Sequence, residues 1–120
     1  MANEITVSMK LSVVKGFLDH VENPGVQTYD MSGLNASGGV QNIGTAAEVL
    51  TFGDVGTPGF AYFRNTGPTN FVEIGTGTGS FVAFAKLKVG ESMLCRLSTN
   101  APSARANTAA INLQYYIVSD

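Results

Sequence analysis

The densest cluster of residues that could do chemistry is formed by Asp19, His20 and Glu22. Two carboxylates and an imidazole this close together could hold a metal ion or relay a proton. His20 is the single histidine of the chain, however, and no second set of ligands with metal-binding spacing completes a site. We therefore interpret the cluster as a solvated strand edge or turn, and we assign no catalytic, cofactor-binding or metal-ligating residue.

A thiol nucleophile would have to be Cys95, the only cysteine. One cysteine is too few for a zinc site or for a disulfide within the chain. Cys95 alternates with Met93 and Leu97, a pattern that predicts a small side chain buried on the apolar face of a strand. Any Cys/His pair or serine triad would depend on the distant His20, so the sequence favours a protein that is not an enzyme.

A glycine-rich segment from Gly75 to Ser80 is similar in composition to a phosphate-binding loop. Such loops direct backbone N–H groups and the start of a helix at an anion. Here the next residues, Phe81 to Lys88, alternate as a strand does, and no Gly-Lys-Ser/Thr sequence is present. The segment is therefore predicted to be a hairpin turn. Asp54 stands alone in its own glycine-rich loop, whereas a calcium site needs several oxygen ligands.

Three further side chains are candidates for surface contacts. Glu73 lies between two apolar residues, so its carboxylate is expected to face solvent or to pair with Arg64 or Lys86 on a neighbouring strand. Tyr116 and Phe84 lie opposite the main apolar row of their strands. Each is either a surface anchor or part of a second buried face. The chain has no tryptophan with which to build a carbohydrate platform.

The composition points to an ordered protein with an unusually uncharged surface. The 120 residues are enough for one domain, and 44% of them are hydrophobic. Only 13% are charged, against about 25% in a typical domain, and Gly, Thr, Asn and Ser fill the deficit. A disordered chain would show the opposite balance. Part of this surface is expected to be covered by another protein.

The charge distribution and the apolar segments exclude several classes of partner. The net charge is −2, and the seven basic residues are scattered, so no basic patch indicates direct binding to nucleic acid. The first residues lack the charged and apolar regions of a signal peptide. No apolar segment is long enough to span a membrane. We expect no membrane partner and no cofactor.

The first part of the chain shows the alternation of strands. Ile5 to Val13 alternates apolar and polar residues, which predicts a strand with one buried face. A second strand is predicted from Phe17 to Glu22, ended by a turn at Asn23-Pro24-Gly25, and a third from Val26 to Met31. Residues 32–39 are rich in Gly and Ser and are predicted to form a loop.

The segment from Val40 to Leu50 is ambiguous. Thr45 and Glu48 have the spacing of a helix capping box, but the run is short, and we favour strand pieces at 41–44 and 48–52. Residues 53–59 have the composition of a loop.

The stretch from Gly59 to Ser98 contains four short apolar runs separated by three turn clusters. This pattern predicts a β-meander of consecutive strands. Its strands are expected at 60–65, 70–75, 80–88 and 92–97. Residues 100–108 are predicted to be a loop, and a final alternating strand begins near Ile111.

Together these segments predict an all-β fold of roughly eight to ten short strands with frequent turns. We expect a single-domain antiparallel β-sandwich, jelly-roll-like, over residues 1–120; a closed barrel fits the pattern less well. The long alternating strands near the two termini could pair in one sheet.

Four segments resemble small all-β virion proteins of tailed bacteriophages, of the head decoration or cement type. These segments are MANEITVSMKLSVVKG, GVQNIGT, TPGFAYFRNTGPTNFVEIGTGTGSFVAFAKLKVGESMLCRL and ANTAAINLQYYIVSD, which cover most of the chain. The resemblance is one of pattern and composition, without a catalytic motif. Some families of this type carry a longer N-terminal arm, whereas the first strand here begins near Glu4.

The resemblance implies a structural virion protein that decorates or cements a bacteriophage capsid by protein–protein contacts. The expected partners are the major capsid protein or other virion proteins and further copies of the chain in a homo-oligomer. The expected location is the virion, with synthesis in the host cytoplasm. Two alternatives remain: a phage fibre or baseplate component, and a β-sandwich module that binds a glycan or a receptor.

Overall fold

The computed structural model describes residues 3–120, and almost all of its regular structure is β-strand, which confirms the all-β prediction. The chain divides into two compact units, one ending at Ser32 and one spanning Gly33–Asp120. The sandwich takes in only the second unit, whereas the sequence predicted one sandwich over residues 1–120. Within residues 3–120 no helix has both the length and the apolar character that a membrane span requires.

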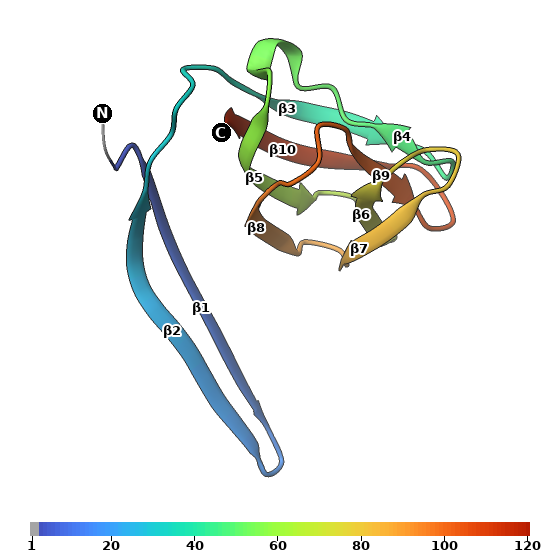
Figure 1. The fold of residues 1–120 in the computed structure, drawn as a ribbon. Coiled ribbons are helices and arrows are strands. Elements are labelled where there is room, and N and C mark those ends of the chain that lie inside the picture. The colour runs from blue at the N-terminus through green and yellow to red at the C-terminus, as the bar shows by residue number, and fades with distance from the viewer. Residues whose placement is uncertain (1–2) are drawn as a thin grey trace. The chain divides into compact units, whose positions relative to one another are not determined.

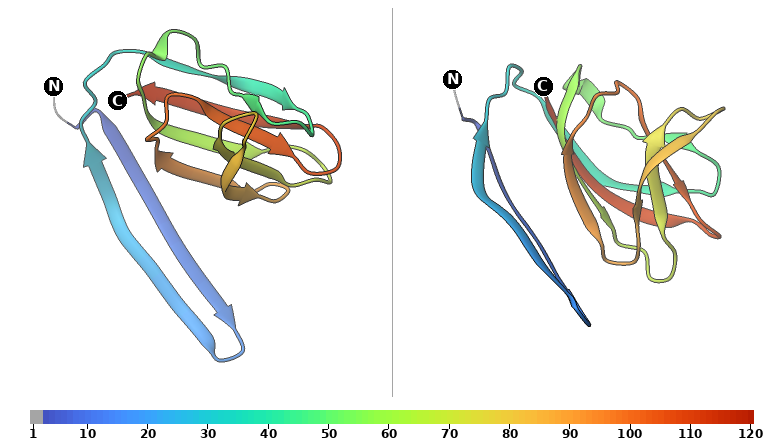
Figure 2. Two further views of the ribbon diagram at one scale, coloured as in Figure 1. Left: turned by 45° about the vertical axis from the view of Figure 1, so that its right-hand side comes forward. Right: turned by 60° about the horizontal axis from the view of Figure 1, so that its bottom comes forward.

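The first unit is a long antiparallel hairpin of β1 (Ile5–Lys15) and β2 (Leu18–Tyr29), which Figures 1 and 2 show as a two-stranded ribbon. The strand predicted from Ile5 is confirmed, but its predicted face is buried only in part. Val7 is buried, yet Met9 and Leu11 in the same apolar row are 45% and 65% exposed. The hairpin has no second layer of its own that could cover this row.

The predicted turn at Asn23-Pro24-Gly25 is also wrong, because these residues form a bulge inside one continuous strand. Met9 pairs with Gly25, whereas Leu11 pairs with Glu22, so β2 has one extra residue at this point. Gly25 takes a φ of 80°, and its N–H donates to Oδ1 of Asn23 at 3.1 Å. Turn-forming residues here bend a strand and do not end it.

The second unit contains two four-stranded antiparallel sheets (Figure 1). The first sheet has the order β3-β10-β5-β8, formed by Ala36–Ile43, Ile111–Ser119, Pro58–Asn65 and Ser92–Arg96. The second has the order β4-β9-β6-β7, formed by Glu48–Val49, Pro102–Ala106, Val72–Thr76 and Val82–Leu87. A short 3-10 helix, η1 (Gly53–Val55), precedes β5.

The strand order corrects three expectations. The predicted meander is wrong, because among its four strands only β6 and β7 pair with a neighbour in sequence, while β5 and β8 pair with each other in the opposite sheet. The segment 100–108 is not all loop: β9 lies within it, between β4 and β6. The first and last strands do not pair, since β1 pairs with β2 and β10 with β3 and β5.

The core lies between the two sheets and draws on both. Period-two alternation directs every second residue of β5, β6 and β10 inward. The largest fully buried apolar side chains are Phe63, Ile43, Leu50, Ile74, Leu113, Ile117 and Val72. All of them come from the second unit, so this unit builds its core without the hairpin.

One buried polar side chain, Asn65 at the end of β5, ties this core to the turns around it. Its Nδ2 donates to the carbonyl oxygens of Asn70 at 2.7 Å and Leu87 at 3.0 Å. Its Oδ1 accepts the N–H of Gly67 at 2.8 Å. Asn65 is fully buried, and its side chain provides hydrogen-bond partners for three backbone groups around it.

Replacing Asn65 by Ala is expected to lower the free energy of unfolding by about 2–5 kcal/mol, because it leaves these backbone groups without partners. Urea unfolding followed by circular dichroism measures the loss. The matched control is Asn112→Ala, since the exposed Asn112 side chain bonds only the amide of Asn42. Equal losses in the two variants would contradict the role given to Asn65.

A chain that begins at Gly33 is expected to fold as the sandwich does in the full chain, because its core contains no hairpin residue. Its urea midpoint should lie close to that of the full-length protein. A truncated chain that shows no cooperative unfolding transition would mean that the hairpin is part of the folding unit.

Candidate functional surfaces

The cluster around His20 forms an exposed hydrogen-bonded pair on the hairpin. Nε2 of His20 lies 2.7 Å from Oε1 of Glu22, and the two side chains are 58% and 70% exposed. Asp19 pairs with Val14 and His20 with Val13, so adjacent side chains on β2 point to opposite faces and Asp19 lies away from the pair. Within residues 3–120 no group of three potential ligands gathers around a metal position.

The glycine-rich segment at residues 75–80 is a hairpin turn between β6 and β7, as the sequence predicted. Thr76 pairs with Val82 across it, and a strand follows where a phosphate-binding loop would have a helix. Gly75 lies at a bulge where a Cβ would come within 2.0 Å of the carbonyl oxygen of Val82. The glycine at this position permits a close backbone approach.

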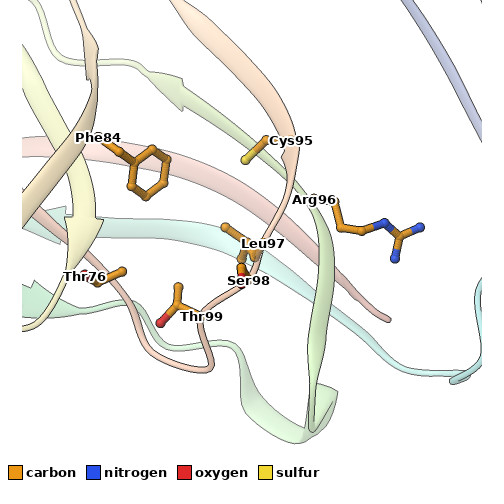
Figure 3. A pocket seen from close by; sticks show the side chains of 7 residues that line it. All are labelled: Thr76, Phe84, Cys95, Arg96, Leu97, Ser98 and Thr99. Atoms are coloured by element: carbon orange, nitrogen blue, oxygen red, sulfur yellow. The ribbon is translucent and has the colours of Figure 1, made fainter.

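A pocket of about 480 Å³ lies where the edge strands of the two sheets, β7 and β8, meet. Its lining residues come from the end of β6, from β7, and from β8 and the segment after it: Thr76, Phe84, Cys95, Arg96, Leu97, Ser98 and Thr99. Figure 3 shows the Cys95 side chain pointing toward Phe84, while the Arg96 guanidinium points away from it.

The lining offers no acid–base pair. Burial raises the pKa of the Cys95 thiol above its ordinary value of 9.0, so the thiol stays protonated and weakly nucleophilic at neutral pH. The Arg96 guanidinium is bound to the Asp120 carboxylate and lies 4.7 Å from the centre of the Phe60 ring. What the pocket presents is a phenyl ring, a leucine and several hydroxyl groups.

The outer face of the second sheet carries a row of charges across three strands. Nη2 of Arg105 on β9 donates to Oε1 of Glu73 on β6 at 2.6 Å. Arg105 also lies 4.7 Å from the centre of the Phe81 ring, and Lys86 lies 4.8 Å from that of Phe71. The sequence predicted that Glu73 faces solvent or pairs with Arg64 or Lys86. In the structure it pairs with Arg105, on a strand that was predicted to be a loop.

The outer face of the first sheet carries a row of aromatic and apolar side chains. Tyr116 of β10 pairs with Tyr62 of β5, which pairs with Leu94 of β8. On the other side Tyr116 pairs with Gly38, where a Cβ would lie 2.4 Å from the tyrosine ring. The ring therefore lies over the glycine of β3. We call the row formed by Tyr116, Tyr62 and Leu94 the tyrosine face.

Two charged residues flank the tyrosine face. The next row of the sheet contains Arg64 of β5, and the row on the other side contains Arg96 of β8 beside Phe60. Tyr116 is 53% exposed and Leu94 37%. Tyr116 is thus a surface side chain, one of the two possibilities that the sequence left open, and so is Phe84 at 53% exposed. The sequence analysis missed Tyr62, although its position two residues from Phe60 and Arg64 places it on the outward side of β5.

The chain was compared with protein-family models, curated proteins and solved structures, and none of them matches it.

The protonated state of Cys95 can be checked by its reaction with a thiol reagent. In the folded protein near neutral pH we expect a rate at least about tenfold below that of a free cysteine, rising with pH as the thiolate forms. The reaction is expected to be slow because a raised pKa leaves less thiolate at a given pH. Unfolding in urea should restore the rate of free cysteine. A fast reaction in the folded state would contradict the burial of the thiol.

Proposed function

We propose that this protein is a structural component of a bacteriophage virion that decorates or cements the capsid through protein–protein contacts. The observation that carries the proposal is the tyrosine face, a row on the outer surface of a sheet in which Tyr116 and Leu94 are exposed and Tyr62 is half-buried. The partners in this proposal are the major capsid protein or other virion proteins, together with further copies of the chain, and the location is the virion.

The chemistry of the tyrosine face is that of a protein interface. Tyrosine and arginine are enriched among the residues that dominate binding energy, and Tyr62, Tyr116, Arg64 and Arg96 lie in adjacent rows. Tyrosine supplies a large contact area with few rotatable bonds, so it loses little entropy on binding. The low charge of the chain lowers the cost of removing such a surface from water.

The strand order gives a second, fold-level argument, which rests on analogy. We propose that the two sheets form a jelly roll, because from β3 to β10 all successive strands except β6 and β7 alternate between the sheets, and the last strand, β10, inserts between β3 and β5. Jelly rolls of eight strands are common in viral capsid proteins and also in lectins. A fold alone does not determine a function, so the argument adds weight only beside the tyrosine face.

A module that binds a glycan or a receptor is the second candidate, and the pocket between β7 and β8 favours it. The pocket combines the exposed ring of Phe84 with the hydroxyl groups of Thr76 and Thr99, which suit a sugar. A fibre or baseplate component would use either surface. The two surfaces share strand β8, but Tyr116 and Tyr62 belong only to the tyrosine face and Phe84 only to the pocket, so substitutions at these residues can separate the two functions.

Cosedimentation with shells assembled from the major capsid protein of the same phage tests the proposal. The wild-type chain should bind the shells, and Tyr116→Ala and Tyr62→Ala should each weaken binding by at least about tenfold. The matched control is Phe84→Ala, because Phe84 and Tyr116 are equally exposed at 53%. This control should bind within about threefold of wild type.

The opposite pattern would overturn the proposal. A wild-type chain that does not bind shells excludes the capsid function, and loss of binding in Phe84→Ala alone would move the contact to the pocket. Binding to a glycan array that depends on Phe84 would support the second candidate. Urea midpoints of all three variants show that a loss of binding does not come from unfolding.

A further inference from the structure

The hairpin exposes a strand edge and, at Met9 and Leu11, part of an apolar row whose other members are buried or half-buried. Among residues 3–120 no strand other than β2 pairs with β1, so the other edge of β1 carries backbone groups without a strand partner. Met9 and Leu11 in the apolar row of β1 are 45% and 65% exposed. An isolated two-stranded hairpin is marginally stable in water, and an open edge of this length readily pairs with another chain.

The two outer edges of the hairpin differ in their ability to accept a partner. β2 contains Pro24, which has no N–H to donate, and the bulge between Glu22 and Gly25 interrupts its regular spacing. β1 runs for 11 residues without proline or glycine. An added strand can therefore form a regular ladder only on the β1 side.

The order of apolar and polar residues along β1 is self-complementary. We propose that the β1 edges of two copies pair antiparallel about a two-fold axis at Met9, which joins the two hairpins into a four-stranded sheet. In this register Met9 meets its own copy, Val7 meets Leu11, and Ile5 meets Val13. Apolar residues thus lie opposite apolar residues in all five positions of the row, as a two-fold interface requires.

Charge favours this register over the one in which the two-fold axis is moved to Lys10. With the axis at Met9, Lys10 lies opposite Ser8 of the second copy and Lys15 lies opposite Asn3. With the axis moved one residue, to Lys10, the two copies of Lys10 would lie directly opposite each other, and like charges in that position are destabilising. An axis at Met9 therefore aligns the apolar row and keeps the cations apart.

The size of the paired segment sets the expected affinity. The ladder from Ile5 to Val13 is about 30 Å long and one strand wide, which is small beside the roughly 800 Å² per partner of a standard interface. We expect a dimer that forms at micromolar chain concentration and dissociates on dilution. The paired sheet also doubles the width of the apolar row that it presents on one face.

This inference concerns self-association in solution and does not rest on the capsid proposal. A dimer that fails to bind shells would support the pairing of β1 alone. Binding to shells by a monomer through Tyr116 would support the capsid proposal alone. The two outcomes are distinguishable because the tyrosine face and β1 belong to different units.

Thiol crosslinking tests the register. In a chain whose native thiol is removed by Cys95→Ala, Met9→Cys should crosslink to its own copy with a short bifunctional reagent. The matched variant Lys10→Cys should not. Val7→Cys and Leu11→Cys should crosslink with each other when the two chains are mixed, and neither should crosslink alone. Crosslinking of Lys10→Cys in place of Met9→Cys, or of none of the variants, would overturn the proposal.

Sedimentation equilibrium tests the dimer without a crosslinker. Met9→Lys should raise the dimer dissociation constant at least about tenfold, because it places two ammonium groups opposite each other on the axis. The control is Phe17→Lys, which introduces the same charge at the fully exposed tip of the hairpin, outside the ladder. A wild-type chain that stays monomeric at all concentrations, or equal effects of the two substitutions, would overturn the proposal.

Discussion

The sandwich depends on the pairing of β5 with β10 at the centre of the first sheet. This pairing places Ala61 beside Ile117 and Phe63 beside Tyr115, and all four side chains point into the core. Because side chains alternate along each strand, the same register that buries these residues directs Tyr62 and Tyr116 outward as neighbours. One set of backbone hydrogen bonds thus determines both the core and the surface that we propose for binding.

Local pattern predicted where most strands lie, but not which strands pair. The runs at Phe60, Ser92 and Ile111 alternate clearly, and each is a strand in the structure. Their partners depend on how two sheets cover each other, which is a property of the whole chain. For this reason β5 pairs with β8 across two intervening strands, although sequence order favoured a meander.

Two misjudged segments show where composition misleads. The strand β9 consists of Pro102, Ser103, Ala104, Arg105 and Ala106, which lack the large apolar residues that signal a strand. Small residues suit its position because β4 and β6 flank it and four of its five residues are buried. Because β9 was predicted to be a loop, the sequence analysis also missed Arg105 as the partner of Glu73. In the hairpin the sequence predicted too much burial. Alternation shows which side chains share a face of the strand, but it does not show whether another layer covers that face.

The division into two units has a consequence for how this protein can change over generations. Substitutions in the core around Phe63 alter the stability of the sandwich, so most of them are removed by selection. The exposed residues of β1 and β2 contribute nothing to that core, and their replacement carries little cost in folding. The hairpin can therefore diverge quickly and take on new neighbours, while the sandwich that bears it stays constant.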